Sequence, residues 1–223
     1  MTMSETYITA LCISGVFIGA LFLAYRYAKE HRKVMEDLAA GQGWAFSRTR
    51  TDMQGLAGKL NALLSDLKCS LTYLMTVETG PRSLVLADGN YTWHAGSNRP
   101  QFASFCLLES PGLKAASAHV EICARNRIDQ LLLGDQVDMG LSSFAEEFIV
   151  QSKDSEAAWK LIDPAMQQVF LDHMAKPLYN PVQVTVDPGG IVLLTGSVNQ
   201  PERWLDLVEF ARQIEWCLAR QGD

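Results

Sequence analysis

Cys106, Cys123 and His119 are the residues whose types and spacing come closest to a catalytic arrangement. Cys106 and Cys123 lie on two short apolar runs that we expect to be neighbouring strands, with His119 near the second run. A thiol beside an imidazole is the pairing that activates a cysteine nucleophile. Buried cysteines that act as small apolar side chains are far commoner, and we favour that interpretation. We therefore assign no catalytic residue.

The candidates for a metal or cofactor site are equally sparse. Asp129, Asp135 and Asp138 surround the run 131–134, but their spacing matches no calcium-binding loop, so we expect a solvated acidic loop. The histidines match no zinc motif such as HExxH; they are His31, His94, His119 and His173. The two glycines of 41–43 follow a predicted helix, whereas a dinucleotide fingerprint follows a strand and has a third glycine. We therefore expect no metal and no cofactor.

Cysteine usage and net charge restrict the compartment and the partners. The chain has five cysteines, an odd number, and no pair has CxxC spacing. A disulfide framework is therefore not expected, and a reducing compartment fits better. From residue 51 onward there are 13 Lys and Arg against 21 Asp and Glu. This acidic balance lacks the basic surface that nucleic acid requires, so we expect no nucleic-acid partner.

Residues 7–25 form an uncharged apolar segment of 19 residues. As a helix it would be about 28 Å long, close to the hydrocarbon thickness of about 30 Å. A cleaved signal peptide would need a basic N-terminal region and a shorter apolar run. The chain instead begins Met-Thr-Met-Ser-Glu. We therefore predict a retained transmembrane anchor over residues 1–27.

Small residues on this segment predict a candidate helix contact. Gly15 and Gly19 form a GxxxG pattern, and Ser14 lies beside Gly15. Small residues one turn apart let a second helix approach closely in lipid. That helix would belong to another membrane subunit or to a second copy of this chain. Because glycine is common in spanning helices, an incidental pattern is the alternative that we favour.

The basic residues that flank the segment predict its orientation. Arg26, Lys29, Arg32 and Lys33 all follow it, and no basic residue precedes it. The positive-inside rule then puts the N-terminus outside and the C-terminal part in the cytoplasm, at a bacterial inner membrane. The same four residues could bind anionic lipid headgroups. A topology signal alone is the simpler interpretation, and it is the one we favour.

The rest of the chain predicts an α+β domain. A juxtamembrane helix and connector are expected over 28–50, and the cytoplasmic domain over 51–223, with 51–140 and 141–223 as two candidate halves. Periodicity predicts a helix over 52–67, followed by strands that form an antiparallel meander. These strands are expected at 70–77, 83–87, 91–94, 101–108 and 118–124, with one turn at 88–90.

The C-terminal third has the clearest signals. A strand is expected at 144–151, helices at 152–161 and 163–174, a hairpin at 182–195 with its turn at 187–190, and a last helix from residue 201. This helix has one apolar stripe, formed by Trp204, Leu207, Val208, Ala211, Ile214 and Leu218. The tryptophans of the domain are expected in its core; they include Trp93, Trp159, Trp204 and Trp216.

The two ends of the chain resemble a family of uncharacterised, membrane-anchored bacterial proteins. The resemblance rests on residues 144–164, on the hairpin 184–194 and on the helix that opens Pro201-Glu-Arg-Trp. The N-terminal order of anchor, basic helix and Gly-x-Gly-Trp strand is similar too. It implies one N-terminal transmembrane helix and a cytoplasmic α+β domain. It implies no activity, because the shared pattern is one of structural positions.

These observations predict a non-enzymatic accessory or assembly subunit of a larger inner-membrane complex. Respiratory, photosynthetic, transport and secretion complexes are not distinguished. The alternative is a membrane-tethered module that senses a small molecule on its middle strands, and the third possibility is an enzyme. A deep pocket with converging polar groups would favour the sensor, whereas an exposed apolar patch would favour the subunit.

Overall fold

The computed structural model describes residues 3–64, 67–80, 82–93, 99–110, 118–125, 135–176 and 182–221, with side chains from residue 16 onward except 24 and 27. It divides into two compact units, Met1–Gln42 and Gly43–Asp223. The candidate halves 51–140 and 141–223 both contribute strands to one sheet in the second unit.

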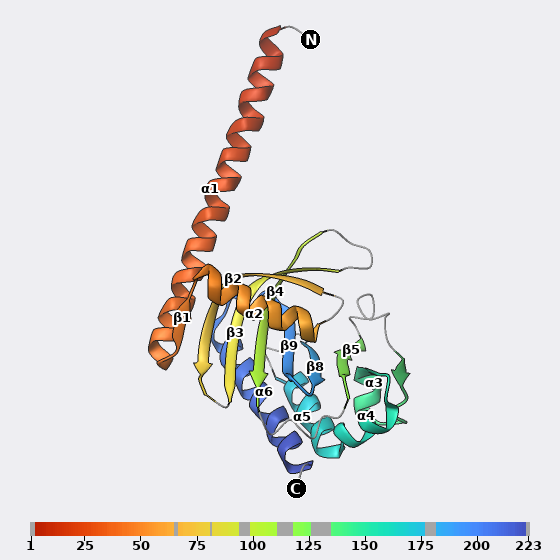
Figure 1. Ribbon diagram of the computed structural model, residues 1–223. Coiled ribbons are helices and arrows are strands. Elements are labelled where there is room, and N and C mark those ends of the chain that lie inside the picture. Colours follow the sequence, from red (N-terminus) through yellow and green to blue (C-terminus); the bar gives the residue numbers. More distant parts are fainter. Residues whose placement is uncertain are drawn as a thin grey trace. The chain divides into compact units, whose positions relative to one another are not determined.

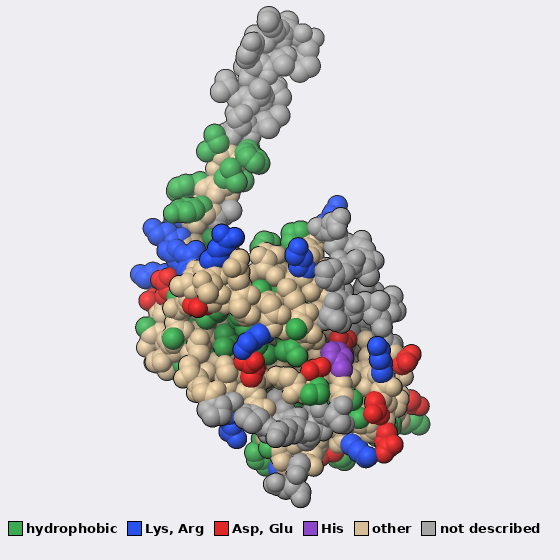
Figure 2. All heavy atoms as spheres, viewed as in Figure 1, with side chains coloured by type: hydrophobic (Ala, Val, Ile, Leu, Met, Phe, Trp, Pro, Cys, Tyr) green, Lys and Arg blue, Asp and Glu red, His purple; other side chains and the backbone are tan. Residues whose placement is uncertain are grey.

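The first unit is a single helix, α1 (Met3–Gln42). The helix predicted over 26–40 is its C-terminal part, and the chain leaves it at Gly43, whose φ of +71° favours glycine. Figure 2 shows hydrophobic side chains along α1, followed by a group of Lys and Arg side chains. Among the described residues, no helix combines the length and the apolar stretch that crossing a membrane requires.

In the second unit, the described residues form one antiparallel sheet of nine strands, in the order β1-β2-β3-β4-β9-β8-β5-β7-β6 (Figure 1). The strands are β1 (Ala45–Ser47), β2 (Leu67–Glu78), β3 (Ser83–Trp93), β4 (Gln101–Glu109), β5 (Val120–Ala124), β6 (Gln136–Val137), β7 (Phe148–Ser152), β8 (Val182–Asp187) and β9 (Gly190–Gly196). The helices are α2 (Arg50–Leu63), α3 (Ser143–Glu147), α4 (Ser155–Leu161), α5 (Pro164–Met174) and α6 (Pro201–Gln221). The predicted α+β class with an antiparallel sheet is confirmed.

The predicted turn at 88–90 is wrong, because β3 continues through it. Gly89 pairs with Leu71 at an irregularity in β2, where the register shifts between Leu71 and Tyr73. A Cβ atom at position 89 would lie 2.2 Å from the backbone oxygen of Ser70. The glycine thus allows two strands to approach closely at a bulge, and Asp-Gly-Asn imitates a turn in sequence.

The predicted strand 144–151 is also partly wrong, because its first residues form α3. Ser142 caps this helix, since its hydroxyl accepts a hydrogen bond from the Ala145 backbone N–H at 3.2 Å. Phe144 then stacks on Phe148, the first residue of β7, with ring centroids 5.0 Å apart. The aromatic contact turns the chain from helix to strand within one apolar run.

Helices cover both faces of the sheet. On one face, α2 packs on an apolar cluster that includes Leu60, Phe105 and Leu194. The opposite face carries Cys106 and Leu193, and α6 packs there on β4 and β9. All six residues predicted for the apolar stripe of the last helix are buried.

The tryptophans divide between core and surface. Trp204 is fully buried, as predicted, whereas Trp159 and Trp216 are 47% and 58% exposed. The core assignment of those two is therefore wrong.

The strands at the two edges of the sheet are short. The edge strand β1 has three residues, and β6 has two. β6 pairs with β7 only at Gln136–Gln151 and Val137–Val150. Beyond Val137 the chain leaves β7 and continues into α3. A gap therefore opens beside β7, where the sheet ends.

Candidate functional site

The two cysteines considered for catalysis are buried and lie apart. Cys106 is on β4 and Cys123 on β5, and strands β9 and β8 lie between them, so they are not on neighbouring strands. Burial raises the pKa of the Cys106 thiol to about 12, so it stays protonated at neutral pH. Both side chains act as small apolar residues of the core.

His119 is bound by carboxylates. Its Nε2 lies 3.2 Å from Glu121 Oε1, and its Nδ1 lies 3.1 Å from Asp187 Oδ2. The hydrogen bond to Glu121 and that to Asp187 raise the pKa of His119, and partial burial opposes them. The imidazole therefore favours the charged form and links the start of β5 to the end of β8.

Polar side chains continue from His119 across one face of the sheet. Register pairs Thr185 with Glu121, Glu121 with Gln151, and Gln151 with Gln136. Paired residues of an antiparallel sheet share a face, so these four form a row across β8, β5, β7 and β6. Thr185 is 1% exposed, and its Oγ1 has no hydrogen-bond partner among the described residues. The row ends at Gln136.

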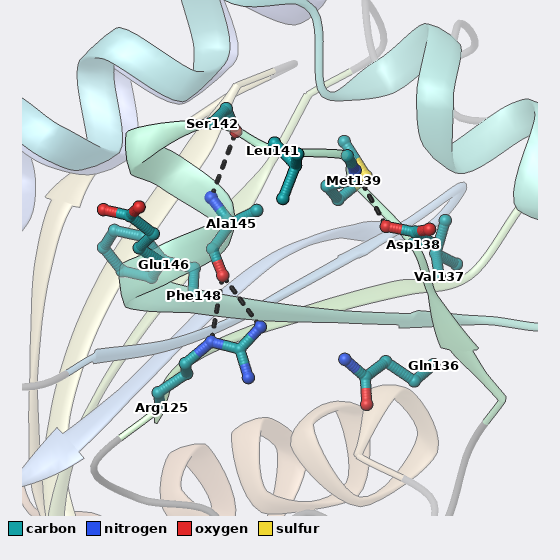
Figure 3. A pocket seen from close by; sticks show the side chains of 11 residues that line it. Arg125, Gln136, Val137, Asp138, Met139, Leu141, Ser142, Ala145, Glu146 and Phe148 are labelled. Carbon is teal, nitrogen blue, oxygen red and sulfur yellow. Dashed lines mark hydrogen bonds between the residues drawn. The ribbon is translucent and has the colours of Figure 1, made fainter.

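Gln136 lines a pocket of about 300 Å³ beside β7, where β6 leaves the sheet (Figure 3). The pocket is open to solvent and is bordered by the end of β5, by β6 and the loop after it, by α3 and by the first residue of β7. It is lined by Arg125, Gln136, Val137, Asp138, Met139, Gly140, Leu141, Ser142, Ala145, Glu146 and Phe148. Its volume is at the lower end of the range for ligand sites.

Arg125 and Gln136 provide the polar wall of the pocket. Arg125 Nε and Nη2 both donate to the Ala145 carbonyl, at 2.9 and 2.8 Å. In Figure 3 the side chains of Arg125 and Gln136 point toward each other, and Leu141 and Met139 lie across the pocket from them. A guanidinium has five N–H donors, so Arg125 retains donors for a ligand after binding Ala145.

The rim of the pocket combines acidic and apolar side chains. Asp138 and Glu146 are exposed, and Asp138 Oδ1 accepts a hydrogen bond from the Gly140 backbone N–H at 2.9 Å. Leu141 is fully exposed. Trp159 from α4 reaches the same loop, because a Cβ atom on Gly140 would lie 3.9 Å from its Cη2 atom.

The residues considered as metal ligands do not come together in the described part of the chain. Asp135 and Asp138 are exposed, whereas Asp129 and His94 lie outside the described residues. No group of three His, Cys, Asp or Glu side chains in that part is arranged to hold a metal ion.

His173 is buried against Phe210, with ring centroids 3.9 Å apart. Burial, with a smaller contribution from the charge of Lys176, lowers the pKa of His173 to about 4. The imidazole is therefore neutral at pH 7.

The residues singled out on the N-terminal helix lie in the first unit. The side chains of Ser14 and Gly15 are outside the described residues, whereas Gly19 is exposed and a Cβ atom there would meet nothing within 4 Å. Arg26 pairs with Glu30 at 3.0 Å, and Arg32 pairs with Glu36 at 3.4 Å. Lys29 and Lys33 are exposed on the same helix.

Sequence reasoning missed the pocket and its polar wall. Arg125 and Gln136 belong to different strand ends, and only the pairing of β5 and β6 with β7 places them on the same side of the pocket. The available signal was local: Met-Gly-Leu-Ser-Ser at 139–143 puts a leucine between turn-forming residues, where a buried side chain is not expected. Gly140 adopts a φ of +72°, which fits such a loop.

No model of a known protein family matches the chain, and no curated protein matches it. Among solved structures, the fold is similar to the crystal structure of the mycobacterial trehalose monomycolate transport factor A, TtfA. The TM-score is 0.51, the sequence identity is 13%, and the match covers 82% of this chain and 91% of that one. At this identity the likeness is one of fold.

Proposed function

We propose that the chain is a non-enzymatic accessory subunit of an inner-membrane complex, anchored by α1, with Gly43–Asp223 in the cytoplasm. The observation that carries the proposal is the exposed apolar segment of α1, whose large side chains point to all sides of the helix. Its large apolar side chains between residues 16 and 25 are 55% to 75% exposed; they are Val16, Phe17, Ile18, Leu21, Phe22, Leu23 and Tyr25.

Such a segment favours an apolar environment. Covering a Leu, Ile or Phe side chain contributes roughly 1.5–3 kcal/mol, so leaving a run of them in water is unfavourable. With the apolar residues that precede them, they complete an uncharged run long enough for the hydrocarbon layer. Arg26, Lys29, Arg32 and Lys33 follow directly and support a cytoplasmic C-terminal side.

The likeness of fold supports one class of complex over the others. The similar structure belongs to a protein that its name describes as a transport factor. Of respiratory, photosynthetic, transport and secretion complexes, we therefore favour a transport complex for this chain.

The anchor is tested by extraction and topology. In a bacterial host, the full chain should remain in the membrane after alkaline carbonate washing, and a periplasm-active reporter fused after Asp223 should be silent. Phe17→Asp with Leu21→Asp should release the chain, because acidic side chains oppose insertion. Release of the unaltered chain, or an active reporter, would refute the proposed anchor or its orientation.

The partner is tested through the small residues of α1. Gly15→Leu with Gly19→Leu should leave insertion intact, since leucine favours it. If that face contacts another membrane helix, association should weaken by about 1–2 kcal/mol, measured by co-purification in mild detergent at matched expression. Equal recovery of all partners would exclude this face as the contact.

The pocket favours one alternative, a tethered module that senses a small molecule. Arg125 and Gln136 would bind the polar part of the ligand, and Val137, Met139 and Phe148 its apolar part. Thermal-shift measurements of the full chain against a panel of small carboxylates test it. A shift that Arg125→Gln abolishes would favour sensing over the subunit role.

A further inference from the structure

The pocket belongs to a larger exposed surface, which we name the β6–α3 surface. It consists of the pocket and of the two exposed apolar side chains at its rim, Leu141 and Trp159. A fully exposed leucine and a half-exposed tryptophan beside an apolar cavity are unfavourable in water. Their arrangement is typical of a contact in which a partner side chain fills the cavity and the rim closes around it.

The charge of this region restricts the partner. Residues 135–163 contain seven acidic residues and two lysines. One of those lysines, Lys160, already pairs with Glu156 at 2.7 Å. Of the charged residues that line the pocket itself, Asp138 and Glu146 are acidic and Arg125 is basic, and Arg125 is held by the Ala145 carbonyl. The surface therefore attracts cations and repels an anionic lipid surface.

We propose that the β6–α3 surface binds a Lys- or Arg-rich protein segment that carries a large apolar side chain, in a cytoplasmic loop of a membrane-protein partner. The inference rests on the proposed cytoplasmic location next to a membrane. Cytoplasmic loops of membrane proteins carry an excess of Lys and Arg, so they are the protein surfaces with the complementary charge at that location.

The pocket provides a place for each part of such a segment. The apolar side chain lies against the exposed Leu141 and Trp159, over a pocket floor to which the buried Val137, Met139 and Phe148 contribute. The flanking cations meet Asp138 and Glu146 at the rim. Arg125 is held by the Ala145 carbonyl, and its remaining N–H groups, with the Gln136 amide, donate to backbone carbonyls of the segment.

A defined peptide tests the proposal. The probe is fluorescein-labelled Gly-Lys-Arg-Leu-Leu-Arg-Lys-Gly, titrated with the full chain in a non-ionic detergent and followed by fluorescence anisotropy. We expect binding that weakens as salt is raised, because the charge attraction is screened. Two control peptides, one with serine for leucine and one with acidic residues for Lys and Arg, should bind at least about tenfold more weakly.

Variants locate the binding. Leu141→Ser with Trp159→Ser should weaken binding at least about tenfold, because both apolar contacts are lost. Asp138→Asn with Glu146→Gln replaces two exposed carboxylates with amides of the same shape, so it should leave the fold intact and flatten the salt dependence. Trp216→Ser, which removes an exposed tryptophan of α6 outside this surface, is the matched control and should bind normally.

The peptide-binding test and the membrane-anchor test can fail independently of each other. No binding of the probe, equal binding of the acidic peptide, or normal binding by Leu141→Ser with Trp159→Ser overturns the proposed surface. Failure of carbonate-resistant membrane association refutes the anchor and leaves the peptide result unchanged. Binding of the full chain to anionic vesicles that Leu141→Ser with Trp159→Ser abolishes, in preference to the peptide, would show lipid recognition and would also overturn the proposal.

Discussion

One face of the sheet has two unlike parts. Under α2, on β2, β3, β4 and β9, the side chains are apolar and form a single cluster around Leu60. On β8, β5, β7 and β6 the same face carries Thr185, Glu121, Gln151 and Gln136. Burying polar groups stabilises a fold only where they are fully hydrogen-bonded. The apolar part therefore contributes most to the stability of the fold. The polar residues of the second part contribute less, so we infer that they serve another purpose.

Leu60→Ala tests most directly how much the apolar part contributes to the free energy of unfolding. Leu60 is fully buried between α2 and the sheet. Removing it should lower the free energy of unfolding by about 3 kcal/mol, because apolar contact is lost and a cavity remains. Urea unfolding of the domain gives this value. Lys59→Ala, on the exposed side of the same helix, is the control and should cost less than about 1 kcal/mol; a similar loss in both would contradict the assignment.

His173, which is buried on the opposite side of the sheet, predicts that the fold loses stability in acid. The pKa of His173 is about 4 in the folded chain and near 6.5 when unfolded. Below pH 6.5 the unfolded chain binds a proton that the folded chain excludes, so stability falls from pH 6.5 to about pH 4. The loss should reach roughly 3 kcal/mol.

Urea midpoints at pH 7 and pH 5 measure about 2 kcal/mol of this loss, the part that falls between those two pH values. His173→Gln should reduce the difference between the two midpoints, since glutamine does not titrate. An unchanged difference would mean that other groups cause the acid sensitivity.

Thr185→Val tests the polar part directly. The Thr185 hydroxyl is buried without a hydrogen-bond partner among the described residues. Replacing it with a methyl group of similar shape should raise the free energy of unfolding by about 1 kcal/mol. Val184→Thr, at the neighbouring buried position that faces the other way, is the mirror control and should lower it. A loss of stability in Thr185→Val would show that the hydroxyl is satisfied.

His119→Gln should have the smallest effect. The pKa of His119 is raised in the folded chain, so its pairing with Glu121 and Asp187 stabilises the fold fully below about pH 6.5. This stabilisation is lost as the pH rises through the pKa of the folded chain. Because the side chain is 40% exposed, solvent screening limits the effect to under about 1 kcal/mol. In thermal unfolding, the variant should be less stable than the parent chain at pH 6 and equally stable at pH 9. A deficit that persists at pH 9 would indicate packing instead of charge.

The elements that sequence predicted best have local causes. Asp163 and Pro164 specify the start of α5, and the Asp163 carboxylate accepts from the Met166 N–H at 2.8 Å. The β8–β9 turn follows from Asp187, whose Oδ1 accepts from the Gly189 N–H at 3.0 Å. Such signals lie within a few residues, so a single sequence contains them.

Elements with distant causes were misread. β3 runs through Asp88-Gly-Asn90 because of a bulge in the partner strand β2, which the residues of β3 do not reveal. The candidate site was missed for the same reason. Arg125 and Gln136 meet only because β5 and β6 flank β7, and the pocket exists only because β6 stops after two residues.

The edge strands are short at both sides of the sheet: β6 has two residues and β1 has three. This shortness affects how copies of the chain can pair with one another. Open sheet edges of full length let identical chains add strand to strand, and tethering to a membrane would crowd many copies into two dimensions. The two edge strands themselves provide few backbone hydrogen bonds for such growth, but β1 pairs only with Leu74, Met75 and Thr76 of β2 and leaves the stretch 67–73 without a strand on that side among the described residues. Copies held side by side in one membrane by the proposed anchor would therefore be expected to add strands only along that stretch of β2.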